Sequence, residues 1–188
     1  MEARVKALGR RIEALVGRLS ASGYIFDHPD DVFPGPDPTV AEAIHRLESV
    51  VGPVPLALKL FWSHVGSVDL TGSHPEWPEP SEYLDQLIVF PLELALYYLD
   101  DYLNDEEAKS LEVLVAPDYF HKANVSGGAP YSVSVPSLTD DPPLNGSPAV
   151  ETFLEHIENA LRFGGFPGLA DCPDHVWPLH SLVDGTEG

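Results

Sequence analysis

The stretch VAEAIHRLESVVGPVPLALKLFWSHVGSVDL, residues 40–70, decides the fold that the sequence predicts. In its first third, apolar residues recur at three- and four-residue spacing, which is the periodicity of a helix with one buried face. Thr39 and Glu42 have the spacing of a capping box, so this helix is expected to begin directly after the threonine. Gly52 followed by Pro53 is expected to end it.

The rest of the stretch predicts a second helix and then a strand. Pro55 suits the first turn of a helix, because its missing N–H would have no intrahelical partner there. The buried face of this helix is expected to comprise Leu56, Leu60, Phe61 and Val65. After Gly66, Val68 and Leu70 alternate with polar residues, which is the period of a half-buried strand.

This arrangement resembles the SUKH superfamily, whose best-known bacterial members are immunity proteins that neutralise toxins. The matching motifs are Ile44, Leu47, Glu48, Gly52, Val54-Pro55, Phe61-Trp62, Gly66, Val68-Asp69-Leu70, Trp77, residues 87–91 and residues 164–168. A departure lies after the second helix, where many members have Gly-Gly or Asn-Gly and this chain has Val65-Gly66-Ser67. The resemblance implies a non-catalytic binding protein. Because the superfamily also includes eukaryotic signalling proteins and phage-type members, it leaves a regulatory or scaffold module as the alternative.

Composition limits the class of protein. With 188 residues, 44% of them hydrophobic, the chain is long enough for one sizeable core, and its length favours one domain. No apolar run approaches the roughly 20 residues that span a bilayer. The basic, amphipathic first segment lacks the apolar block and cleavage site of a secretory signal. The single cysteine, Cys172, excludes an internal disulfide framework, so a cytoplasmic location is expected.

Charge is the strongest compositional feature. The chain has 30 acidic and 10 basic residues, a formal net charge of −20, and residues 1–18 carry a net +3 while residues 19–188 carry −23. A surface this negative repels nucleic acid and anionic lipid and attracts basic partners. The ordinary alternative is that the acidity serves only solubility.

The remaining segments complete an α+β prediction. An amphipathic helix with one apolar stripe is expected near the N-terminus, docked on the acidic body. Strands are expected at residues 86–90 and 111–115, and a hairpin at residues 119–135 that turns at Ser126-Gly127-Gly128. Pro91 is expected to open a long helix, and Ser147-Pro148 to cap and open the last one. The predicted architecture is a central, mostly antiparallel sheet of about five strands, flanked by helices from both chain ends.

The predicted organisation is one globular unit in three parts. Residues 1–38 form the first helix and a connector rich in proline and aspartate. Residues 39–168 form the SUKH-like domain, and residues 169–188 form a tail that is partly packed.

Positive signals for catalysis, a cofactor or a metal are missing from the sequence. Cys172, His175 and His180 have a spacing that suits a zinc site poorly. His121 and Lys122 are expected in a strand, where neighbouring side chains point to opposite faces. A small hydrolase using His121 or Cys172 remains an alternative, although no base beside the thiol can be located. Phosphate-binding loops, a Gly-x-Ser-x-Gly elbow and a His-Glu-x-x-His motif are absent.

Candidate binding residues are therefore acidic or aromatic, and they form two groups. The first lies in and beside one proline-rich loop and comprises Asp69, Glu76, Trp77, Glu79, Glu82 and Asp85. The second comprises Asp100, Asp101 and Asp105. These residues are expected to contact a protein partner, namely a basic toxin domain of the kind found in nucleases.

Overall fold

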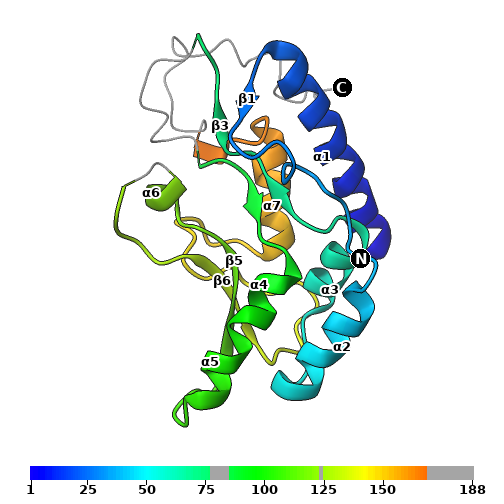
Figure 1. The fold of residues 1–188 in the computed structure, drawn as a ribbon, viewed down its shortest axis with the longest axis vertical. Coiled ribbons are helices and arrows are strands. Elements are labelled where there is room, and N and C mark those ends of the chain that lie inside the picture. Colours follow the sequence, from blue (N-terminus) through cyan, green and yellow to red (C-terminus); the bar gives the residue numbers. More distant parts are fainter. Residues whose placement is uncertain (77–84, 123–124, 169–188) are drawn as a thin grey trace.

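The computed structural model describes residues 1–76, 85–122 and 125–168. Helices and short antiparallel strand pairs alternate in these ranges, so the chain is of the α+β class (Figure 1). No helix in the described ranges is both long and apolar enough to cross a bilayer.

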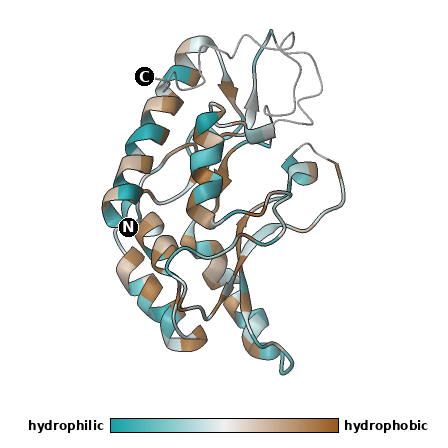
Figure 2. Cartoon of the chain, turned by 180° about the vertical axis from the view of Figure 1, so that it is seen from behind, coloured by the Kyte–Doolittle hydropathy of each residue, from teal (hydrophilic) through white to brown (hydrophobic). Residues whose placement is uncertain are grey.

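Three helices form one side of the molecule: α1 (Glu2–Ser22), α2 (Val40–Val51) and α3 (Leu56–His64). Hydrophilic and hydrophobic residues follow one another along α1 (Figure 2), and its apolar stripe is buried against α3 and α7 (Phe153–Arg162). Gly23 ends α1 in the left-handed conformation, as a helix C-cap often does. The guanidinium of Arg4 bonds both carboxylate oxygens of Glu158, at 2.7 and 2.9 Å, so an ion pair joins α1 to α7.

The strands form three antiparallel pairs. β1 (Ile25–Phe26) pairs with β3 (Gly72–Ser73), β2 (Val68–Asp69) pairs with β4 (Ile88–Val89), and β5 (Leu111–Ala116) pairs with β6 (Tyr131–Val135). The predicted sheet of about five strands is therefore wrong. Four of the strands are only two residues long, and Pro117 directly follows β5, where it has no N–H to extend a ladder. A hydrogen bond of 2.7 Å from the Phe90 N–H to the Val115 carbonyl links the β2–β4 pair to the β5–β6 pair.

The predicted hairpin at residues 119–135 is also wrong in its first arm. Residues Tyr119–Lys122 form the short helix α6, and β6 pairs with β5 instead. The cause is Asp118, whose carboxylate accepts the backbone N–H groups of Phe120 and His121 at 2.9 and 3.3 Å. An aspartate in this position favours a helical turn over an extended strand.

The predicted helix after Pro91 consists of two short helices, α4 (Leu92–Tyr97) and α5 (Leu99–Asn104). In Figure 1, α5 and the turn after it project from one end of the molecule. The break places Asp100 and Asp101 in the first turn of α5, where the helix terminus favours negative charge.

Helix α2 lies between Thr39 and Gly52 as predicted, but two side-chain N-caps were predicted at the wrong residues. The Thr39 hydroxyl donates to Asp37, at 2.5 Å, and makes no capping bond to α2. The capping box lies at the start of α7, where Thr152 and Glu155 bond each other's backbone N–H groups. This helix therefore begins five residues later than Pro148, and Val150, which precedes it, is fully exposed.

Candidate functional site

An open groove of about 850 Å³ lies between α4, β5 and the segment that leads into α6. We call it the α4 groove. Its lining is mainly apolar and aromatic: Phe90, Pro91, Leu94, Tyr97, Tyr98, Leu114, Pro117 and Pro130. Glu93, Asp118 and His121 complete the lining, which contains neither lysine nor arginine. The groove can therefore accept an apolar group, and the formal charges around it are negative.

A run of carboxylates continues from the groove along α5. Residues 91–108, here called the acidic segment, contain six acidic residues and no lysine or arginine: Glu93, Asp100, Asp101, Asp105, Glu106 and Glu107. All six are exposed. None of them forms an ion pair with a basic residue in the described part of the chain. Their charge is thus directed to solvent.

Two large apolar side chains of the acidic segment are also exposed. Tyr97 is 73% exposed and Leu103 is 59% exposed. The Tyr97 ring meets the Tyr98 ring edge to face, with centroids 5.2 Å apart. The segment therefore presents apolar and anionic groups side by side.

Asp118 and His121 form an acid–base pair in the wall of the groove. The Asp118 carboxyl is 3% exposed and contacts Nδ1 of His121, whose side chain is 52% exposed. Burial raises the pKa of Asp118, but hydrogen bonds from His121 and from two backbone N–H groups outweigh burial and hold that pKa below its usual range. Gly128 packs against this carboxyl, where a Cβ atom would overlap it.

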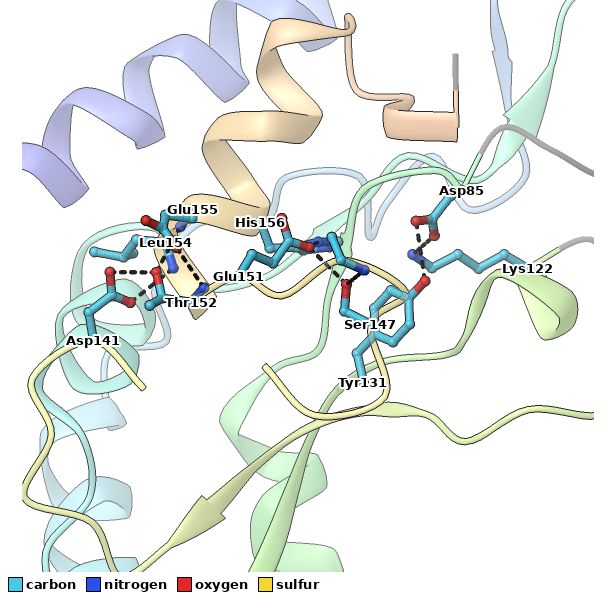
Figure 3. A network of polar contacts seen from close by, with 11 residues as sticks. Asp85, Lys122, Tyr131, Asp141, Ser147, Glu151, Thr152, Leu154, Glu155 and His156 are labelled. Carbon is cyan, nitrogen blue, oxygen red and sulfur yellow. Dashed lines mark hydrogen bonds and ion pairs between the residues drawn. The ribbon is translucent and has the colours of Figure 1, made fainter. Parts of the chain in front are cut away.

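Lys122, the residue after the pair, points into the core. Its Nζ is fully buried and lies 2.6 Å from Oδ1 of Asp85, and the Tyr131 hydroxyl donates to the other oxygen of Asp85 (Figure 3). Burial lowers the pKa of Lys122, against the opposing effect of Asp85, and burial raises the pKa of Tyr131. These three groups bond one another and leave no charge for a ligand.

A second histidine–carboxylate pair lies in the core (Figure 3). His156 is 2% exposed, and its Nδ1 lies 2.7 Å from Oε1 of Glu151, which also accepts the Ser147 hydroxyl. Burial raises the pKa of Glu151, but the bonds from His156 and Ser147 outweigh it and lower that pKa. Nε2 of His156 is buried without a hydrogen-bond partner in the described chain, and the ring meets Tyr131 edge to face. The imidazole is therefore shielded from solvent.

The predicted binding residues have different positions in the structure. Asp69 accepts both the N–H and the hydroxyl of Thr71, and Asp85 is bonded to Lys122, so both carboxylates are used inside the chain. Glu76 is exposed, as are the three predicted residues of the acidic segment. The other predicted residues, and the cysteine and histidines weighed as zinc ligands, lie outside the described residues: Trp77, Glu79, Glu82, Cys172, His175 and His180.

Sequence reasoning missed the groove and the contact between Asp118 and His121. The available signal was the spacing Asp118-x-x-His121 directly after Pro117, which is typical of a capped helical turn. Alternation of apolar residues favoured a strand there instead. In the described ranges, no group of three or more His, Cys, Asp or Glu side chains is arranged to hold a metal ion.

Comparisons with known proteins do not place the chain in a family. No protein-family model matches the sequence. Neither the curated proteins nor the solved structures contain a match.

Proposed function

We propose that this chain is a non-catalytic protein-binding module that takes a basic partner, in the manner of an immunity protein that occludes a toxin domain. The observation that carries the proposal is the acidic segment, with six exposed carboxylates and no basic residue. Charged surfaces of this kind raise the rate at which an oppositely charged partner associates and suppress binding of acidic ones.

Helix stability does not account for this acidity. The first turn of α5 favours Asp100 and Asp101, but Asp105, Glu106 and Glu107 follow the end of the helix, where its terminus disfavours negative charge. These carboxylates repel one another, and the bond that Asp105 accepts from the backbone N–H of Glu107, at 3.0 Å, leaves their charges unpaired. A cationic partner would relieve that repulsion.

A partner capture and titration tests the proposal. The tagged chain is used at low salt to capture a protein from the lysate of the cells that make it, and the captured protein is then purified and titrated across a range of salt concentrations. Affinity should fall steeply as salt rises, because surface charges are screened. Replacing Asp100, Asp101 and Asp105 by asparagine should weaken binding more than the matched replacement of Asp27, Asp30 and Asp31, which are exposed in the connector.

The results of this experiment distinguish the proposed function from its alternatives. An affinity that is unchanged between low and high salt would contradict the electrostatic proposal. Equal weakening by both triple variants would show that the acidic segment is not the contact surface. Survival of cells that express the partner only when the chain is present supports immunity, whereas a harmless partner supports the regulatory or scaffold alternative.

A small hydrolase is the second candidate, and one observation favours it. A buried carboxylate that orients an exposed imidazole is the arrangement of a general base, and the Asp118–His121 pair has it. Among the described residues, the groove lining contains no serine, threonine or cysteine, so a hydrolase built on these residues would use water as the nucleophile. Hydrolysis of p-nitrophenyl acetate by the wild-type chain and by His121→Ala decides between the candidates, since equal rates exclude His121 as the base.

A further inference from the structure

We infer that the α4 groove receives an apolar side chain of the basic partner, while the acidic segment binds arginine or lysine residues on either side of it. This inference rests on the proposed function and specifies its contact surface. The ligand it describes is a peptide segment in which an apolar anchor is flanked by cations.

The apolar part of the inference follows from Tyr97 and Leu103. Both are large and more than half exposed, and Tyr97 lines the groove. Covering such surface on association is favourable, and rigid aromatic residues next to a pocket are frequent centres of binding energy. The edge-to-face contact with Tyr98 supports the Tyr97 ring from one side, so little freedom is lost on binding.

The cationic part follows from the charges around the groove. The Asp118 carboxylate is already bonded to three donors, whereas Glu93 lies in the lining, exposed and without a basic partner in the described chain. Asp100 and Asp101 follow Tyr97 by three and four residues. If an apolar side chain of the partner contacts Tyr97, the partner residues on either side of that side chain therefore lie close to the carboxylates of Glu93, Asp100 and Asp101.

The same charges disfavour other occupants. A fatty acid would bring its carboxylate towards Glu93 without meeting a lysine or arginine in the lining. A nucleic acid would bring phosphates to the acidic segment. A second copy of this chain, with its net charge of −20, would bring mostly like charge.

Three synthetic ten-residue peptides test the inference: one alternates arginine with leucine, one arginine with serine, and one glutamate with leucine. Binding to the full chain is measured at low salt by fluorescence anisotropy, and the site is mapped from backbone amide chemical shifts. The arginine–leucine peptide should bind most tightly and shift Leu94, Tyr97 and Leu114. Tyr97→Ala should weaken it about tenfold, as truncation of a central aromatic anchor does.

Two control variants show whether a loss of binding comes from the lost contact or from misfolding of the chain. Tyr97→Phe retains the apolar ring and should keep most of the affinity. Leu138→Ala removes a side chain that is 89% exposed and lies outside the groove lining, and it should leave binding unchanged.

Three other results would overturn the inference. Equal binding of the two arginine peptides, unaffected by Tyr97→Ala, removes the groove but leaves the acidic contact surface of the proposed function. Tightest binding of the glutamate–leucine peptide removes the selection for cations, and the absence of any binding removes the site. A different pair of results would refute only the proposed function. In that case the arginine–leucine peptide binds the groove as expected, but the affinity for the natural partner does not change with salt.

Discussion

Two histidine–carboxylate pairs in this chain have the same chemistry and different surroundings. In both, Nδ1 of the imidazole faces a carboxylate whose pKa is lowered. His121 is 52% exposed in the wall of the groove, whereas His156 is 2% exposed in the core and its Nε2 has no partner in the described chain. The comparison teaches that burial of the ring, and not the pairing itself, decides whether such a pair is available to a ligand or only supports the fold.

The largest expected effect comes from breaking the buried pair. Glu151→Ala leaves the ring of His156 buried with both nitrogens unbonded, and loss of one partner of a buried pair costs about 3 kcal/mol of unfolding free energy. Urea unfolding followed by circular dichroism measures the loss. Glu13→Ala, at an exposed position of α1, is the control and should stay within about 0.5 kcal/mol of wild type. A loss below about 1 kcal/mol for Glu151→Ala would mean that the core adapts to the unpaired ring.

A smaller effect, dependent on pH, is expected at the exposed pair. Asp118→Asn can still cap α6 but loses its charge, and it should cost about 1 kcal/mol at pH 7, because its partner His121 is half exposed. The pKa of Asp118 in the folded chain is lowered, so its contribution to stability is present above the ordinary aspartate pKa, near 3.8, and is lost as pH falls through the lowered value. Unfolding free energies of both proteins from pH 7 to pH 2 should therefore converge at the acid end. A constant difference would show that charge is not the cause.

The smallest effect is expected from removing the exposed ring itself. His121→Ala should change the unfolding free energy by less than about 0.5 kcal/mol, because the ring is half in water and Asp118 keeps its backbone donors. His28→Ala, another exposed histidine, provides the reference value. Thermal unfolding of the two variants measures the difference. A much larger loss at His121 would assign this pair to the fold, and the contrast with the core pair would disappear.

Local patterns predicted α1 and α2 well, whereas the buried face predicted for α3 is wrong in part, because Leu56 is exposed and Ala57, Leu58 and Trp62 are buried. The apolar stripes of α1 and α2 follow from three- and four-residue spacing, and Gly52 follows the end of α2 as expected. Caps were less predictable, because the Thr39 hydroxyl had a nearer acceptor in Asp37. Whether a hydroxyl bonds a neighbouring side chain or caps the helix depends on the geometry of the loop, which residue spacing does not specify.

Strand pairing and the candidate site were beyond local patterns. Apolar residues alternate in residues 119–125 as they do in a strand, but bonds to the carboxyl of Asp118 favour a helical turn. The strand β6 then pairs with β5, and the long segment between them connects the two strands. The α4 groove is lined by residues of α4, of β5 and of the segment between β5 and β6, so it forms only when these parts pack together. Only the acidity of the candidate surface was evident from the sequence.

The contact between Arg4 and Glu158 has a consequence for synthesis of the chain. The two residues are 154 positions apart, and α1 packs on both α3 and α7. As the ribosome makes the N-terminus first, the apolar stripe of α1 can meet α3 early but must wait for α7 until nearly all described residues have been translated. Until α7 has been made, the part of the apolar stripe that packs on α7 stays uncovered in the nascent polypeptide, where it is a surface that chaperones can bind.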